Sequence, residues 1–545
     1  MDYMKSIRQV LEEISGIKNP DIEFSSIDSF GDYSTNIALK NKDIDPNDIA
    51  LKVNNLNLDY TAEVKGKFVN FWLKNDALVD NLIQIDKDKD SYGKSNIGKN
   101  KTVIIDYSSP NIAKPFSIGH LRSTVIGQAI YNLFKSLGYQ VIGDNHLGDW
   151  GTQFGKLLYM IDFKKTKDFS IENLEELYVE FHKLEKTDET LGERAREWFK
   201  KLEDGDSTAR TVWKQCVNVS LNEFKRIYDL LDIKVDNTYG ESFYEEEMKE
   251  MLKDPSINKH IVDGEDGDSK VINLESVGIK TPLMFLKGDG ATTYATRDLA
   301  TLRFRQKKYK PDIIVYEVGA EQKLHFKQVF EAAKMLDLID KDVELVHTAH
   351  GLYLAEDGKK FSTRKGKTIK LEEVLDEAIE RAKELGNNKE VAKQVGIGAI
   401  KYFDLMHSVQ SDVVFDWNKI LNMNGNSGPY IQYTVARINS VVSKSDKNNL
   451  NLKDLQTKNL EVEEILLLRK LSQFQEVMVT AGKTYSPNIL CNYLYELSSK
   501  FNTFYNAHKI VGGKNEYFKI LLTSGVCVVL KNGLEILGID TPEKM

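Results

Sequence analysis

The N-terminal segment MDYMKSIRQVLEEIS has the spacing of an amphipathic helix. Its apolar residues recur three or four positions apart, and charges of both signs lie between them. A secretory or transit peptide has a different charge pattern. We therefore interpret this segment as the first helix of a folded chain.

The pattern changes near residue 95. The segment IDKDKDSYGKSNIGKNK, which ends at Lys101, is polar, contains glycine and has no apolar period, so we expect a linker there. The β-branched strand TVIIDYS follows, then a helix with an apolar residue at every fourth position from Leu121 to Leu137, then Gly138 as a stop signal and the strand YQVIGD. Residues 102 to 144 therefore predict a β-α-β unit of the doubly wound kind.

Residues 156 to about 297 interrupt this pattern. They are charged and helical up to about residue 260, and turn-rich segments follow. The strand DIIVYEVGA and the amphipathic run HFKQVFEAAKMLDL then resume the α/β alternation, whereas strands become scarce after residue 404. We expect a small α+β domain (1–95), an α/β Rossmann-like domain with a helical insertion (96–404, insertion about 156–297) and an all-α bundle (405–545).

Length and composition agree with a multidomain, water-soluble chain. A single core seldom organises 545 residues, and 41% apolar with 29% charged residues is ordinary for a globular protein. No apolar run approaches the ~20 residues that span a bilayer, so we expect no membrane partner. The three cysteines match no metal or redox spacing, which predicts core thiols in a cytoplasmic protein: Cys216, Cys491 and Cys527.

The net charge of -8 argues at first against a nucleic-acid partner. Binding needs only local basic surface, however, and six basic residues fall within the short stretch from Lys359 to Lys370. A charge run of this kind is more often a solvated face. Charge alone therefore leaves both interpretations open.

The segment SSPNIAKPFSIGHLRST predicts a phosphate-binding helix start. A strand end passes through a turn into a helix whose first turn holds Gly119, His120 and Arg122. Such a start offers free backbone N–H groups to phosphate, Gly119 permits close approach, and His120 can donate a hydrogen bond. A capped helix with an incidental histidine is the alternative.

The sequence of this segment resembles the HIGH signature region of class I aminoacyl-tRNA synthetases in its arginyl form. Two further segments resemble that family in the expected order: GDNHLGDWGTQFG (143–155) and KKFSTRKG (359–366), which is similar to the KMSKS loop. GNSGPYIQYTVARINS extends the resemblance into the C-terminal part. The resemblance implies a catalytic domain, an ATP-dependent arginine-tRNA ligase activity, and L-arginine, ATP and tRNA(Arg) as partners.

Two departures from the family pattern concern the ATP phosphates. Ser117 replaces the first histidine of HIGH. Thr363 replaces the second lysine of the loop, and the resemblance implies that Lys114 supplies the missing cation at the ATP phosphates. The resemblance implies ATP binding by Ser117, Gly119, His120, Lys360 and Ser362, and catalytic roles for His120, Lys114, Lys360, Arg364 and Lys365. It implies Mg²⁺ only together with ATP, and the sequence specifies no metal ligand.

Tyr294 and Asp298 are candidates for choosing arginine. Four residues apart on a helix, they share a face, where a carboxylate can pair with a guanidinium and a ring can stack on it. A surface tyrosine and a salt-bridged aspartate are the alternative. The resemblance adds further arginine contacts: Glu241, Gln322, Asp106, Ser109 and Asn111.

Candidate tRNA contacts lie in both terminal parts. Tyrosines with nearby donors could stack and bind splayed bases, although tyrosines at helical spacing are more often core residues. By resemblance to the anticodon-binding domain and to the family's N-terminal extra domain that contacts the tRNA corner, the candidates are Tyr430, Gln432, Tyr433, Arg437, Phe68 and Asn70. Phe68 and Asn70 could equally be strand residues of a small core.

The implied reaction has two steps: arginine attacks the α-phosphate of ATP, and the terminal ribose of the tRNA then attacks the adenylate. We expect a cytoplasmic enzyme that acts as a monomer. Two rivals remain at this point. One is a nucleotidyltransferase that adenylates a small molecule, which would need no helical RNA-binding bundle. The other is a non-catalytic synthetase-like RNA-binding or regulatory protein, against which the intact His120, Lys360, Asp298 and Tyr294 argue.

Overall fold

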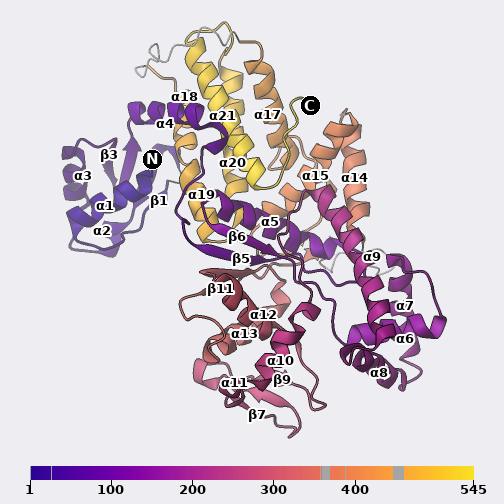
Figure 1. Cartoon of the computed structure of the whole chain (residues 1–545). Helices are drawn as coiled ribbons and strands as arrows, with labels where there is room; N and C mark the ends of the chain where they lie inside the picture. The colour runs from indigo at the N-terminus through magenta and orange to yellow at the C-terminus, as the bar shows by residue number, and fades with distance from the viewer. Residues whose placement is uncertain (1, 26, 356–357, 359–368, 387, 446–458) are drawn as a thin grey trace. The chain divides into compact units, whose positions relative to one another are not determined.

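The computed structural model describes residues 2–545 apart from 26, 356–357, 359–368, 387 and 446–458 (Figure 1). The chain forms two compact units. The central unit comprises residues 96–381 and 407–417, and the terminal unit comprises residues 1–95, 382–406 and 418–545.

A four-stranded parallel sheet organises the central unit. Its strands are β5 (Thr102–Asp106), β6 (Gln140–Asp144), β10 (Ile313–Tyr316) and β11 (Glu344–His347), in the order β11-β10-β5-β6. The chain leaves β5 toward β6 and later returns to place β10 on the other side of β5. In such sheets the ligand crevice lies outside the carboxyl ends of the two strands where the order reverses. The predicted doubly wound α/β fold is confirmed.

Helices pack on this sheet because this packing buries their apolar faces. The short helix η3 (Ile118–His120) leads into α5 (Leu121–Ser136), and α12 (Tyr294–Tyr309) and α13 (Lys323–Met335) belong to the second half. At Gly127 of α5 an added Cβ would lie 2.2 Å from the Tyr107 side chain, so only glycine allows this close approach. A core of buried residues including Ile104, Leu299 and Val329 joins the sheet to α12 and α13.

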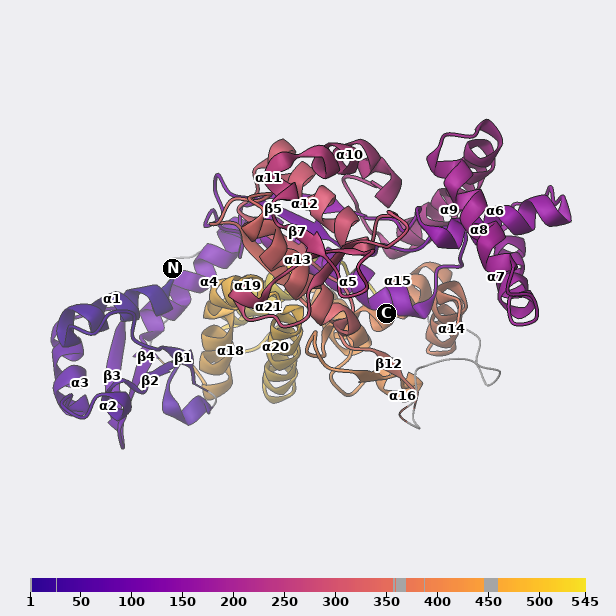
Figure 2. The ribbon, with the colours of Figure 1, turned by 90° about the horizontal axis from the view of Figure 1, so that it is seen from below.

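The predicted insertion is present and mostly helical. Figures 1 and 2 show α6 (Thr152–Lys164), α7 (Ile171–Leu184), α8 (Leu191–Glu203) and α9 (Ser207–Leu231) grouped together. After them come η4 (Glu241–Tyr244), α10 (Glu245–Lys253), α11 (Pro255–Asn258), η5 (Glu275–Val277) and an antiparallel sheet of β7 (Ile261–Asp263), β8 (Lys270–Ile272) and β9 (Leu283–Leu286).

The remaining elements of the central unit follow the insertion. They are η6 (Ala320–Gln322), β12 (Tyr353–Leu354), β13 (Val413–Val414) and α14 (Leu371–Glu384), and the last turn of α14 belongs to the terminal unit.

The terminal unit combines an α+β part with a helical bundle. The α+β part has an antiparallel sheet in the order β1-β2-β4-β3. Its elements are α1 (Tyr3–Ser15), β1 (Glu23–Phe24), η1 (Asp28–Phe30), β2 (Tyr33–Thr35), α2 (Ile37–Lys40), α3 (Pro46–Asn55), β3 (Tyr60–Lys65), β4 (Phe68–Leu73), α4 (Asn75–Asp88) and η2 (Lys89–Ser91). The bundle comprises α15 (Lys389–Leu405), α16 (Trp417–Ile420), α17 (Gly428–Val442), α18 (Val462–Ser472), α19 (Phe474–Lys483), α20 (Pro487–Ala507) and α21 (Glu516–Ile536). The expected all-α C-terminal part is confirmed.

Helix α21 differs from the expectation that no apolar segment is long enough to span a bilayer. By length and composition α21 could cross a membrane, which is true of no other helix in the described part of the chain. Of its apolar window, 78% is buried inside the fold, as is typical of a core helix. The three cysteines are free thiols and buried, as predicted.

Candidate active site

A cavity of about 590 Å³ opens at the carboxyl ends of β5 and β10, where the strand order reverses. Nine of the residues predicted from the sequence line it: Asp106, Ser109, Asn111, Gly119, His120, Glu241, Tyr294, Asp298 and Gln322. The structure therefore brings together residues from distant parts of the sequence at one site.

The turn after β5 shapes one wall of the cavity. Ser108 and Ser109 both have positive φ angles, which are unusual for residues with side chains. Hydrogen bonds hold the turn: the Ser108 amide donates to Ser123 Oγ at 2.9 Å, and Ser109 Oγ donates to Asp106 Oδ1 at 2.9 Å. This turn places Ser109 and Asn111 on the cavity wall, ahead of η3.

His120 lies at the start of α5 with a defined tautomer. Its Nδ1 accepts a hydrogen bond from the Ser117 amide at 3.0 Å, so in the neutral ring Nε2 bears the proton. Ser117 Oγ also lies 3.1 Å from Nδ1. Ser117 is buried and caps η3, and the cavity lining includes His120 but not Ser117.

Glu241 forms an ion pair that the sequence did not reveal. Arg297 Nε lies 2.9 Å from Glu241 Oε2, and the two side chains are 6% and 11% exposed. The Arg297 guanidinium also lies 4.7 Å from the centre of the Tyr294 ring. Burial raises the pKa of Glu241 to about 7, while the positive charge of Arg297 opposes the shift.

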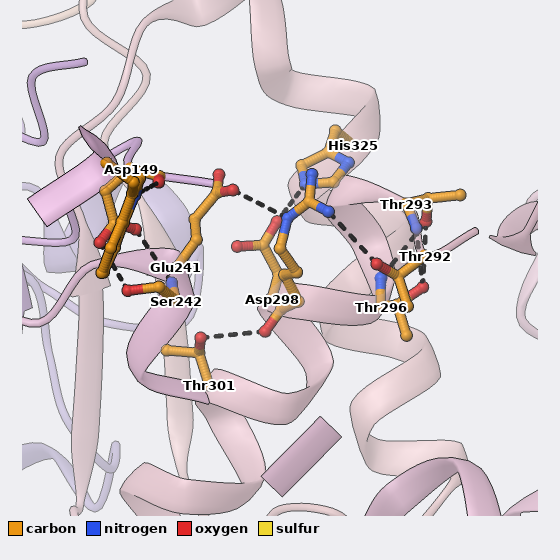
Figure 3. A network of polar contacts seen from close by, with 11 residues as sticks. Asp149, Glu241, Ser242, Thr292, Thr293, Thr296, Asp298, Thr301 and His325 are labelled. Atoms are coloured by element: carbon orange, nitrogen blue, oxygen red, sulfur yellow. Dashed lines mark hydrogen bonds and ion pairs between the residues drawn. The ribbon is translucent and has the colours of Figure 1, made fainter. Parts of the chain in front are cut away.

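Asp298 has a histidine partner from α13. Asp298 Oδ2 and His325 Nε2 are 2.6 Å apart, and Figure 3 shows both side chains close to Glu241. Burial lowers the pKa of His325, but the hydrogen bond to Asp298 and its negative charge outweigh this and raise the pKa overall. Asp298 and His325 both line the cavity.

Arg305 is a buried residue that sequence reasoning missed. Its Nη2 lies 2.6 Å from Asp106 Oδ2 and 2.7 Å from Asp144 Oδ2, and its side chain has no exposed surface. Burial raises the pKa of Asp144, an effect that Arg305 opposes. One signal in the sequence was that α12 is rich in polar residues on every face, with Arg297, Asp298 and Arg305 all on the same helix.

One predicted phosphate ligand, Lys114, does not line the main cavity. Lys114 lies with Nζ 4.8 Å from the centre of the Tyr178 ring and lines a separate small cavity. Burial lowers the pKa of its ammonium group. The loop residues Lys360, Ser362, Arg364 and Lys365 lie outside the described residues, so their roles stay predictions.

The candidate tRNA contacts differ in accessibility. Phe68 and Tyr433 are exposed, and the Arg437 guanidinium lies 4.9 Å from the centre of the Tyr433 ring. Tyr430 is partly buried and accepts a hydrogen bond from Asn502. Gln432 and Asn70 are buried, and Gln432 donates to the carbonyls of Gln394 and Asp540. A base could not reach these last two side chains in this structure.

Among the described residues, no group of three or more histidine, cysteine, aspartate or glutamate side chains could hold a metal ion.

The parallel sheet, the helix start at His120 and the cavity at the reversal point lie within a segment that matches the catalytic domain of class I tRNA synthetases. The family model for the catalytic domain of class I (R) tRNA synthetases matches residues 81–417, and the model for the DALR anticodon-binding domain matches residues 431–545.

Sequence relatives and solved structures narrow the class. Arginine-tRNA ligase of Clostridium botulinum is 39% identical over the full length of both chains, and that of Halothermothrix orenii is 39% identical over 96% of this chain and 95% of its own. The arginyl-tRNA synthetase of Plasmodium falciparum superposes with a TM-score of 0.82 at 27% identity, covering 100% and 99% of the two chains. The chain belongs to the arginyl-tRNA synthetase family.

Proposed function

We propose that the chain is an arginine-tRNA ligase, which activates L-arginine with ATP and transfers it to the 3′-terminal ribose of tRNA(Arg). The observation that supports this most is that two carboxylates, Glu241 and Asp298, line the same cavity as the Tyr294 ring. Arginine is the proteinogenic amino acid whose planar cation fits such a wall.

Asp298 is the principal guanidinium partner in this proposal. Its neighbour Glu241 already faces the cation of Arg297, so Asp298 supplies the charge that the substrate must match. Gln322 lines the same cavity and can orient the bound side chain. Ser109 and Asn111, from the turn after β5, would hold the α-amino and carboxylate end, with Asp106 behind them.

ATP binds at the start of α5 in this proposal. Gly119 and His120 line the cavity there, and the Nε2–H of His120 is a donor suited to phosphate oxygens. Mg²⁺ enters with ATP as part of that substrate. By family resemblance, the loop cations Lys360, Arg364 and Lys365, with Ser362 and Lys114, complete the phosphate contacts.

The reaction needs no nucleophile from the chain. The arginine carboxylate attacks the α-phosphate, pyrophosphate leaves, and the ribose hydroxyl of the tRNA then attacks the carbonyl of the adenylate. The site contributes orientation and charge stabilisation. The bundle holds the anticodon side of the tRNA through the exposed Tyr433 and the partly buried Arg437, and Phe68 contacts its outer corner. The enzyme acts as a monomer in the cytoplasm.

An aminoacylation assay tests the proposal. Purified protein is incubated with ATP, total tRNA and each of the twenty amino acids in turn, and we expect charging with arginine alone. Adenylation of a small molecule without transfer to RNA would indicate a nucleotidyltransferase instead. Absence of ATP turnover together with RNA binding would indicate a non-catalytic RNA-binding protein.

A further inference from the structure

The carboxylate proposed to bind the substrate cation already has a partner. His325 Nε2 lies 2.6 Å from Asp298 Oδ2, with side-chain exposures of 25% and 17%, so both face the cavity and stay partly dehydrated. The carboxylate can accept hydrogen bonds at both oxygens, but an imidazolium on one of them competes electrostatically with a second cation. The following inference rests on the proposed function.

We propose that His325 is a positioning residue for Asp298 that gives up its proton when the guanidinium of arginine binds, so that arginine binding is coupled to proton release. In the empty site the imidazolium orients Asp298 and balances its charge. In the occupied site the guanidinium, which cannot lose its proton, takes over the charge, and the neutral ring keeps its hydrogen bond through Nε2–H.

The charges around His325 favour this exchange. On the cavity wall, three other carboxylates already have internal partners: Glu241 pairs with Arg297, Glu317 with His350, and Asp106 with Arg305. The other ionisable side chains on that wall are His120, His146, Tyr294 and Tyr316. Asp298 is more exposed than these three carboxylates, with 17% of its side chain accessible against 0% for Glu317, so a substrate cation can pair with Asp298 in place of protonated His325.

Thermodynamic linkage determines how the dissociation constant of arginine changes with pH. The pKa of His325 in the empty site is raised by Asp298, so the ring keeps its proton to higher pH than an ordinary histidine does. If binding expels that proton, arginine binds more weakly as pH falls through this pKa. For full coupling, the dissociation constant rises by up to about tenfold for each pH unit below it.

The test is calorimetry of arginine binding in buffers of different ionisation enthalpy, between about pH 6 and 8. His325→Gln keeps a neutral donor to Asp298, and His325→Asn is a second such variant if the first folds poorly. His508→Gln is the matched control, because His508 forms a similar pair with Glu463 at 3.1 Å in the terminal unit.

We expect wild-type protein and His508→Gln to release a proton on binding, and His325→Gln to release less and to lose the weakening at low pH. Glu241 can also lose a proton, so the difference between variants, rather than the total, is the relevant quantity. Equal proton release in His325→Gln and wild type would overturn this inference and leave the proposed function intact. No arginine binding by wild type would overturn both.

Discussion

Arg305 and Asp106 form an ion pair, with 2.6 Å between Nη2 and Oδ2, that is closed off from solvent. Arg305 also reaches Asp144, so one guanidinium on α12 ties together the carboxyl ends of β5 and β6. The cavity wall that holds Asp106 is therefore fixed by a charge network on a neighbouring helix.

Arg305→Met should destabilise the central unit strongly. The substitution leaves two buried carboxylates without their cation, and breaking a buried pair costs about 3 to 5 kcal/mol. Arg226→Met is the matched control, because Arg226 pairs with Glu223 and Glu372 at the surface, where a pair contributes about 0 to 1 kcal/mol. Unfolding in denaturant measures both, and similar midpoints for the two variants would refute the prediction.

Ser117→Ala and His120→Ala should differ in their effects on catalysis. Ser117 Oγ contacts His120 Nδ1 and caps η3, so its loss should cost about 1 kcal/mol of stability and little of kcat. His120→Ala removes a donor worth roughly 2 to 4 kcal/mol in the transition state, or about 30- to 1000-fold in kcat. Comparable losses of kcat in single-turnover adenylate formation would contradict this ranking.

Glu476 should make the terminal unit less stable at high pH. Its oxygens accept hydrogen bonds from the Met4 amide and from Tyr33, both at 2.7 Å, and burial raises its pKa to about 7. Because the folded pKa lies above the unfolded one, the stability contribution is full below the unfolded pKa of about 4.3 and is lost as pH rises through about 7.

Glu476→Gln is the variant that tests this effect. It should gain stability relative to wild type as pH rises, by an amount on the order of 3 kcal/mol at full titration. Thermal unfolding at acidic and alkaline pH measures the difference, and Glu13→Gln, at an exposed position of α1, is the control. A difference between Glu476→Gln and wild type that does not change with pH would show that Glu476 does not titrate in this range.

The sequence predicted the elements that periodicity defines. The β-α-β unit from Thr102 to Asp144 followed from apolar spacing, and the nine predicted cavity residues followed from motifs and family resemblance. Such signals are local, or they repeat at fixed positions in related chains. They suffice to place residues on strand ends and helix starts.

The pairings between elements could not be predicted from the sequence. Tertiary packing brings Arg297 to Glu241, Arg305 to Asp106 and His325 to Asp298. No spacing in the sequence encodes the distances within these pairs. Burial was equally hidden, because Gln432 lies next to the exposed Tyr433 and yet is buried and donates to two backbone carbonyls. The apolar character of α21 was overlooked because polar residues interrupt it.

Asp298→Asn tests most directly the claim that this cavity selects arginine by charge. Asparagine keeps the size but turns one acceptor into a donor that faces a cation with donors only, and truncating one partner of such a pair costs about 2 to 5 kcal/mol. Asp229→Asn, at an exposed carboxylate of α9 that pairs with Lys225, is the control.

The measurement is steady-state aminoacylation by folded, purified protein with arginine as the varied substrate. For Asp298→Asn we predict that kcat/KM for arginine falls by roughly thirty-fold to several thousand-fold, that the KM for ATP changes little, and that discrimination against neutral citrulline weakens. An arginine KM equal to that of wild type and of Asp229→Asn would contradict the account and make Asp298 an ordinary structural carboxylate.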